Sequence, residues 1–155
     1  MKVYLLSLVL GISHASMSQK DLVVLSDSIL VQRIVSDLGY SSFRPNEITH
    51  SEIKEIRGLM KGYVSSYNQK LNAEIRYKSE FDLMKIMGMN RYRLQFVPFE
   101  DDFGDTIVWI NGFCDNYDYW KNDIVQVLDG GNCFFQLLIN LSKRDLLDIR
   151  VNGHA

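Results

Sequence analysis

Apolar side chains recur every three or four residues between positions 49 and 71. Thr49 and Glu52 have the capping-box spacing, in which the hydroxyl and the carboxylate each accept a hydrogen bond from a free backbone N–H at the start of a helix. The apolar positions that follow are 53, 56, 60, 63, 64, 67 and 71. We expect one amphipathic helix of about five to six turns, whose apolar stripe must pack on another element.

A shorter segment upstream has the same spacing. Apolar residues stand at positions 30, 31, 34, 35 and 38, with Ser26 or Asp27 as a possible N-cap and Gly39 just past the end. These start and stop signals predict a short N-terminal helix.

From residue 94 onward the period changes to two, which is typical of strands. Strands are predicted over 94–99, 106–114, 124–128, 133–141 and 146–152. Pro98 cannot donate to a ladder, so it indicates an edge or a bulge. In the last segment Leu147, Ile149 and Val151 alternate with polar residues, so we expect one face of the sheet to be core and much of the other to be wet.

The pair Gly130-Gly131 fits either a hairpin turn or a bulge within one long bent strand, and the unequal lengths of the flanking segments favour the bulge. Helices followed by an antiparallel meander predict an α+β fold, with the long helix packed on a roughly four-stranded sheet. No repeat or linker divides residues 16–155, which we interpret as a single domain.

The N-terminus predicts export. Lys2 precedes an almost wholly apolar stretch over residues 3–12, and Ser13 and Ala15 are small residues at the positions that signal peptidase requires. Ten residues are too few to span a bilayer, which needs about 20. Residues 1–15 are therefore interpreted as a signal peptide, and the mature chain as secreted or periplasmic with no transmembrane segment. A buried N-terminal strand, with translation starting at Met17, is the alternative.

Composition narrows the function classes. The 155 residues are 46% hydrophobic and 23% charged, with a net charge of −2, so there is no basic surplus for nucleic acid. The mature chain would keep only His50 and His154, both expected at the surface, and it lacks the common nucleophile, metal and phosphate-loop motifs. Acidic runs over 100–105 and 115–118 offer oxygen ligands for calcium but also suit solvated turns. No catalytic residue, metal or cofactor is predicted.

Cys114 closes one predicted strand and Cys133 opens a later one. If those strands are antiparallel neighbours, the pairing itself brings the cysteines together, and an even cysteine count in an exported chain favours a disulfide. Two buried free thiols are the alternative.

The segment between the cysteines is rich in aromatic residues. Tyr117, Tyr119 and Trp120 stand among acidic neighbours, and flat rings give contact area at low entropic cost, which suits capture of a partner. We name these three as candidate partner-binding residues. The alternative is that the rings cover the end of the sheet as a small core.

Four sequence blocks resemble an uncharacterised family of small exported proteins of Gram-negative bacteria. They are Ile107–Cys114, Asp118–Lys121, Val127–Phe135 and Val151–Ala155. The resemblance covers residues 49–155 and implies no known activity. At the level of fold, a long helix followed by four antiparallel strands resembles the cystatin-like architecture, which implies binding rather than catalysis. The inhibitory wedge motif of cystatins is absent.

Together these patterns favour an exported, non-catalytic module that binds an unknown protein or another cell-envelope component. The alternative function is a small-ligand carrier or an enzyme with a pocket between the long helix and the sheet.

We expect N-terminal sequencing of the mature protein from whole cells to begin at Ser16, because signal peptidase would cut after Ala15. An intact Met1 on the mature protein would contradict the assignment.

Overall fold

The capping box at Thr49 starts the long helix α2 (His50–Glu74), as the sequence predicts. Thr49 Oγ1 accepts from the Glu52 backbone N–H at 3.3 Å, and Glu52 Oε2 accepts from the Thr49 N–H at 2.7 Å. The Thr49 hydroxyl also donates to Glu52 Oε2 at 2.7 Å, and this bond, followed by the one from the Thr49 N–H, stabilises the ionised carboxylate and lowers the pKa of Glu52. The computed structural model describes residues 21–153, so the predicted signal peptide and His154 lie outside the described residues.

The short helix α1 (Ser28–Asp37) is also confirmed. The Asp27 carboxylate accepts from the backbone N–H groups of Ile29 and Leu30 at 2.9 and 3.3 Å. Gly39 follows the helix at a φ of 81°, a left-handed conformation that glycine adopts without strain.

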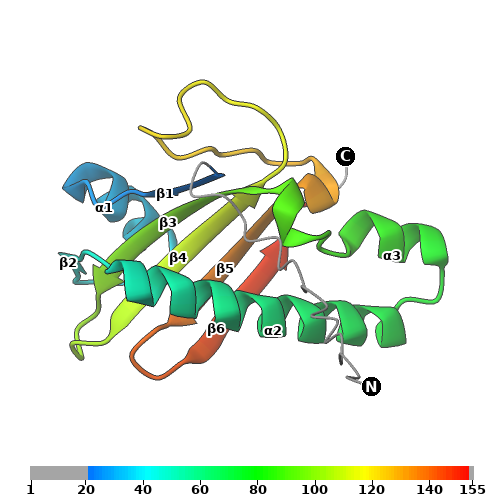
Figure 1. Ribbon diagram of the computed structural model, residues 1–155, viewed down its shortest axis with the longest axis horizontal. Helices are drawn as coiled ribbons and strands as arrows, with labels where there is room; N and C mark the ends of the chain where they lie inside the picture. Colours follow the sequence, from blue (N-terminus) through cyan, green and yellow to red (C-terminus); the bar gives the residue numbers. More distant parts are fainter. Residues whose placement is uncertain (1–20, 154–155) are drawn as a thin grey trace, which may run out of the picture.

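The sheet is built on an antiparallel meander of β3 (Arg93–Glu100), β4 (Thr106–Phe113), β5 (Phe134–Asn140) and β6 (Asp145–Val151). Two short strands complete it: β1 (Leu22–Val24) runs parallel to β3, and β2 (Arg44–Pro45) pairs antiparallel with it. The strand order is β1-β3-β4-β5-β6 (Figure 1). The predicted α+β fold with a long helix and a mostly antiparallel sheet is therefore confirmed.

Three further short elements lie in the connections. The helix α3 (Lys78–Met84) and the 3₁₀ turn η2 (Met89–Arg91) lie between α2 and β3, and the 3₁₀ turn η3 (Gly131–Cys133) lies between β4 and β5. Sequence patterning missed them, and missed β1 and β2, because segments of two to seven residues are too short to establish a period.

The edge or bulge predicted at Pro98 is wrong, because β1 and β2 pair with β3 on the side away from β4 and the β3–β4 register runs through Pro98 without a shift. The backbone carbonyls of Phe96 and Pro98 accept from Leu25 and Asn46, so at these positions β3 turns its backbone groups away from β4. The missing N–H of Pro98 therefore removes no bond of the β3–β4 ladder, which explains how proline is tolerated inside this strand.

Helix α2 packs on one face of the sheet (Figure 1). Its buried residues Ile56, Met60 and Val64 meet the even-numbered side chains of β3 and β4 and the odd-numbered side chains of β5. This interface is the main core, and it is filled by side chains.

The opposite face is not wet, which corrects the sequence expectation. Val97, Phe99 and Ile107 form a second core there with Val31 and Val35 of α1, and Ile124 joins them from the connection between β4 and β5. The alternation in the strands is therefore apolar on both faces over most of β3–β5, because a helix and a long loop cover the second face.

Two local predictions were wrong. Residues 124–128 form no strand, and Gly130-Gly131 is neither a hairpin turn nor a bulge: Gly130 is left-handed with a φ of 97°, and Gly131 begins η3. A Cβ on Gly130 would come within 2.5 Å of the Phe134 ring, so only glycine fits. The actual irregularity lies in β6, where Leu138 pairs with Asp148 and Ile139 with Leu146. Leu147 is thereby left out of the core face, 47% exposed.

Candidate functional site

A disulfide closes the connection between β4 and β5. Cys114 and Cys133 are bonded with their Cα atoms 5.1 Å apart, and the Cys114 N–H donates to the Cys133 carbonyl at 3.0 Å. The predicted disulfide is confirmed. It fixes both ends of residues 114–133, which we call the disulfide loop. Its central part lies across the sheet face opposite α2.

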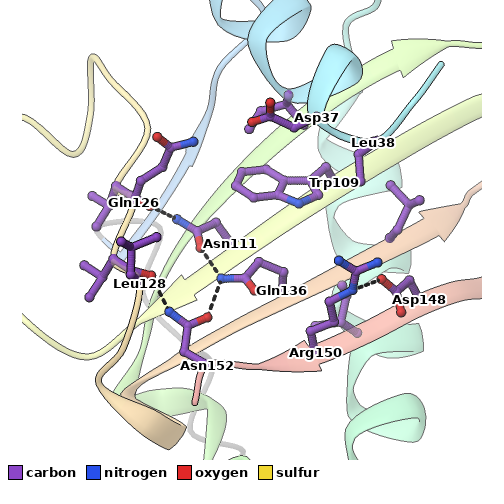
Figure 2. A pocket seen from close by; sticks show the side chains of 15 residues that line it. Asp37, Leu38, Trp109, Asn111, Gln126, Leu128, Gln136, Asp148, Arg150 and Asn152 are labelled. Carbon is purple, nitrogen blue, oxygen red and sulfur yellow. Dashed lines mark hydrogen bonds and ion pairs between the residues drawn. The ribbon is translucent and has the colours of Figure 1, made fainter. Parts of the chain in front are cut away.

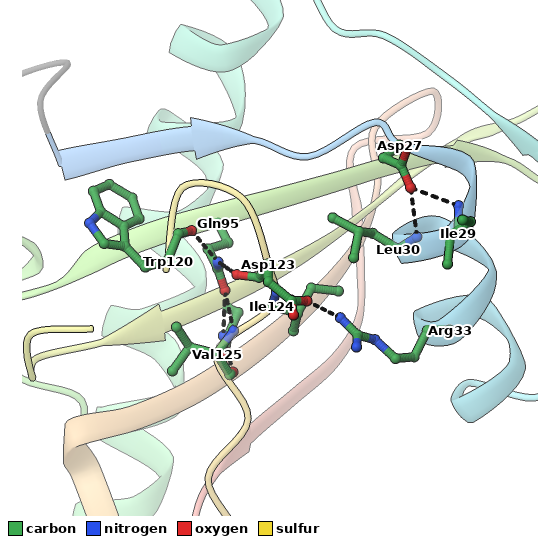
Figure 3. A network of polar contacts seen from close by, with 10 residues as sticks. Asp27, Ile29, Leu30, Arg33, Gln95, Trp120, Asp123, Ile124 and Val125 are labelled. Atoms are coloured by element: carbon green, nitrogen blue, oxygen red, sulfur yellow. Dashed lines mark hydrogen bonds and ion pairs between the residues drawn. The ribbon is translucent and has the colours of Figure 1, made fainter. Parts of the chain in front are cut away.

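A row of side-chain amides, Gln95, Asn111, Gln136 and Asn152, ties the disulfide loop to the sheet. We call this row the amide ladder. It begins at Gln95 on β3, whose Nε2 donates to the carbonyls of Trp120 and Asp123 at 2.5 and 2.7 Å (Figure 3). Gln95 Oε1 accepts from the Val125 N–H at 3.0 Å. A single buried side chain thus makes three hydrogen bonds to the loop backbone.

Asn111 on β4 is the register partner of both Gln95 and Gln136. Its Nδ2 donates to Gln95 Oε1 at 3.0 Å and to the Val125 carbonyl at 2.7 Å. Its Oδ1 accepts from Gln136 Nε2 at 3.4 Å. Asn111 therefore links two strands of the sheet to the loop through three hydrogen bonds.

Asn152 ends the amide ladder just beyond β6. Its Oδ1 accepts from Gln136 Nε2 at 3.2 Å, and its Nδ2 donates to the carbonyls of Val127 and Asp129 at 2.5 and 3.2 Å (Figure 2). Gln95 and Asn111 are 0% and 1% exposed, and no buried side-chain nitrogen or oxygen of the described residues lacks a hydrogen bond. Moving the disulfide loop would leave these buried amides unpaired, and each unmade buried hydrogen bond costs about 1–3 kcal/mol. The loop therefore has one favourable position on the sheet.

The fixed loop forms one wall of a groove of about 500 Å³, which we call the ladder groove. Strands β4, β5 and β6 supply its floor, and the end of α1 around Asp37 and Leu38 supplies the other wall (Figure 2). The half-buried ring of Trp109 lies on the floor, packed at its base against the second core. Leu128, which is fully exposed, stands on the rim.

Charged groups of both signs line the ladder groove. Arg150 pairs with Asp148 on the same strand, with Nε 2.5 Å from Oδ2. Asp148 Oδ1 also accepts from the Ile149 backbone N–H at 3.0 Å. The carboxylate is thus held in place, whereas the Arg150 side chain stays 72% exposed toward solvent.

An ion pair joins α1 to the disulfide loop. Arg33 binds the Asp123 carboxylate, which also accepts from the Ile124 N–H at 2.7 Å (Figure 3). The bond from Arg33, and then that backbone bond, lower the pKa of Asp123. Both walls of the ladder groove are therefore connected to each other as well as to the sheet.

The three aromatic residues named from the sequence lie elsewhere, at the end of the sheet. Trp120 is only 6% exposed and packs edge-on against Phe113 with ring centroids 5.9 Å apart. Tyr117 is half-buried against Phe113 at 5.8 Å, and Tyr119 is 46% exposed. Trp120 and Tyr117 thus belong to a small core, the alternative left open by the sequence, whereas Tyr119 contacts the Tyr117 ring and presents much of its own ring to solvent.

The acidic run at the β3–β4 turn is organised by its own backbone and by cations. Asp101 Oδ1 accepts from the N–H groups of Phe103 and Asp105 at 2.9 and 3.0 Å. Asp105 is bound by Lys143 and by Asn140 Nδ2, and these bonds lower the pKa of Asp105. Cys114, Asp115 and Cys133 also lie close together, but the two sulfurs are in the disulfide and offer no thiolate to a metal.

Sequence reasoning missed Trp109, Gln136 and the ladder as site residues. The ladder residues have a signal in the sequence, which is a polar side chain in a strand with apolar neighbours on both sides along the chain, as with Gln95 and Asn111. Such a pattern marks a buried polar group, but it does not give the register that aligns the amides across strands.

No protein-family model matches the chain, and neither the curated proteins nor the solved structures give a significant match. The resemblances to a family of exported proteins and to cystatins therefore stay predictions. Over residues 21–153, none of the helices combines the length and the apolar character needed to cross a bilayer.

We expect Asn111→Leu to destabilise the protein by about 2–4 kcal/mol, because it leaves the buried Val125 carbonyl without its side-chain donor and removes one partner each from Gln95 and Gln136. The backbone N–H of Val125 should also exchange faster with solvent. Urea unfolding and hydrogen exchange measure the two effects. Gln126→Leu, at an exposed neighbouring position, serves as the control and should change the free energy of unfolding by less than about 0.5 kcal/mol. Equal behaviour of the two variants would contradict the ladder's role.

The lowered pKa of Asp123 predicts a pH-dependent contribution to stability. A carboxylate whose pKa is depressed on folding stabilises the native state above its unfolded pKa of about 4, and that contribution disappears as the pH falls through the folded value. Asp123→Asn should therefore lower the midpoint of urea unfolding at pH 7, and the difference from the unmodified protein should become progressively smaller below about pH 4. The effect should be small and should shrink in high salt, because both side chains are partly exposed. A difference that stays constant down to pH 2 would exclude this ion pair as its cause.

Proposed function

We propose that the protein is an exported, non-catalytic binding module that holds a component of the cell envelope in the ladder groove. The observation that carries the proposal is Trp109, a large aromatic ring left only half-buried on the floor of a preformed groove. Pockets with an apolar floor and a few convergent polar groups are the usual form of ligand sites, and about 500 Å³ lies within their range.

Rigidity supports binding in this groove. The disulfide, the amide ladder and the Arg33–Asp123 ion pair fix the loop wall before any ligand arrives. A preformed site loses less conformational entropy on binding than a mobile one, so more of the contact energy appears as affinity.

The composition of the groove favours binding over catalysis. Its lining contains no histidine, cysteine, serine, threonine or lysine, so a nucleophile with a neighbouring base is not assembled there. Of its two carboxylates, Asp148 is already engaged by Arg150 and a backbone N–H. His50, the histidine of the described residues, starts α2 on the other side of the sheet.

The groove also bears on the alternative of a small-ligand carrier or an enzyme with its pocket between the long helix and the sheet. That interface is filled by buried side chains from α2 and the strands. The ladder groove on the opposite face offers space for a small ligand, which keeps the carrier function compatible with this proposal.

Export is supported by the disulfide, because such bonds persist in oxidising compartments outside the cytoplasm. A secreted or periplasmic module would meet proteins and cell-envelope polymers as its partners. An open groove suits a segment of such a molecule.

Photocrosslinking tests the location of the site. We expect benzoylphenylalanine in place of Leu128, on the groove rim, to form a covalent adduct when cells that make the protein are irradiated. The same group in place of Ile29, which is 74% exposed on α1 and outside the groove, is the matched control. Adducts at 128 that disappear when Trp109→Ala is added would support the proposal. Equal adducts at both positions, or none at 128, would refute it.

A further inference from the structure

We infer that the ligand of the ladder groove is a neutral saccharide chain, an inference that rests on the binding function proposed above. Sugars combine apolar C–H faces with hydroxyl groups around their edges. The ladder groove places an aromatic ring next to hydrogen-bonding side chains on adjacent strands, which matches both features of a sugar.

The apolar part of the complement is Trp109. Its ring is packed at the base against the second core, which fixes its orientation, and its other side lines the open groove (Figure 2). A rigid indole presents a flat, weakly hydrated surface of the size of a sugar ring, and such a surface gains contact area with little loss of entropy. Leu38 and Leu128 extend the apolar surface on the two walls.

The polar part lies beside it on β5 and β6. The Asp148–Arg150 ion pair uses Nε of the arginine, which leaves the two terminal nitrogens of the exposed guanidinium as donors in one plane. Gln136 uses its Nε2 for Asn111 and Asn152, which leaves its carbonyl oxygen Oε1 as an acceptor. Donors and acceptors on planar side chains match pairs of neighbouring hydroxyls.

Charge disfavours the main ionic ligands. The charged lining consists of Asp37, Asp148 and Arg150, which sums to a formal −1. A phosphate or carboxylate ligand would meet two carboxylates and an arginine that is already paired. Anionic ligands normally require a surplus of cationic donors, which this groove lacks.

A peptide ligand is also disfavoured by the floor of the groove. Peptides that bind by β-augmentation gain their affinity by adding a strand to a free sheet edge. The floor consists instead of the sheet face of β4–β6, and the backbone groups of β4 and β5 are engaged by neighbouring strands on both sides. The Asn111 and Asn152 amides, which could bind a peptide backbone, are used by the disulfide loop.

The two tryptophans allow a direct measurement. Trp120 is 6% exposed, so Trp120→Phe leaves Trp109 as the single indole of the chain and the reporter of the groove. In this background we would titrate neutral oligosaccharides of glucose and of N-acetylglucosamine, two to four residues long, up to about 10 mM. That range covers the weak affinities expected of a short ligand in an open groove. We would also titrate envelope extracts from the source cells, untreated, oxidised with periodate or digested with protease. Periodate cleaves vicinal diols, whereas protease removes peptides.

We expect a saturable change in Trp109 fluorescence with at least one oligosaccharide or with the untreated and protease-digested extracts. Periodate abolishes the response to the extract where the ligand has vicinal diols, as 1,4-linked glucose does, and spares 1,4-linked N-acetylglucosamine, which has none and is identified by the oligosaccharide titration. Arg150→Ala should weaken the response about tenfold or more, whereas Arg91→Ala, at an exposed position outside the groove, should leave it unchanged. Circular dichroism of each variant confirms folding. Arg150→Ala is expected to fold, because the Arg150 side chain is 72% exposed.

The contrary outcomes separate this inference from the function beneath it. A response that survives periodate but is lost with protease would overturn the saccharide and leave the binding groove standing, with a peptide as its ligand. No saturable response to any oligosaccharide or extract would overturn both. An equal loss in Arg150→Ala and Arg91→Ala would show that the response does not come from the groove.

Discussion

Four side-chain amides aligned across the sheet determine where the disulfide loop lies, and both the second core and the groove depend on that position. Gln95 and Asn111 are among the few buried polar residues of the described chain, and each makes at least three hydrogen bonds. Buried amides are costly when unpaired and directional when paired. The ladder therefore specifies a single register between the loop and the sheet, which apolar contacts alone, being non-directional, would not.

The two faces of the sheet differ in how completely they are covered. The α2 face is a closed core in which Ile56, Met60 and Val64 are fully or nearly buried against the strands. The opposite face is covered only in part, by α1 and the disulfide loop, and the ladder groove is the space between them. Polar and charged residues such as Gln136 and Arg150 therefore lie on the second face, beside the half-buried Trp109.

Much of the fold could be predicted from local signals. Thr49 with Glu52, and Asp27 before α1, cap helices by bonds within four residues, and the period of two located all four strands of the meander. The predicted disulfide followed from strand pairing. The site could not be predicted, because it depends on non-local register: Asn111 meets Gln95 and Gln136 only when three strands align. The predictions of a wet second face and of a strand over 124–128 were wrong for the same reason, because alternation along the chain cannot show that a distant segment covers a face.

The register shift that displaces Leu147 also affects how the edge of the sheet can pair with other molecules in crowded surroundings. Strand β6 ends the sheet on one side, and an unprotected edge strand is a template for pairing with another copy. The register shift at Leu138/Ile139 interrupts its hydrogen-bonding rhythm, and Asp145, Asp148 and Arg150 place charges along it. On the other side, β1 and β2 span three and two residues, too few to recruit a neighbour. Both borders of the sheet are thus built to resist self-association, which would keep the groove accessible at high local concentration.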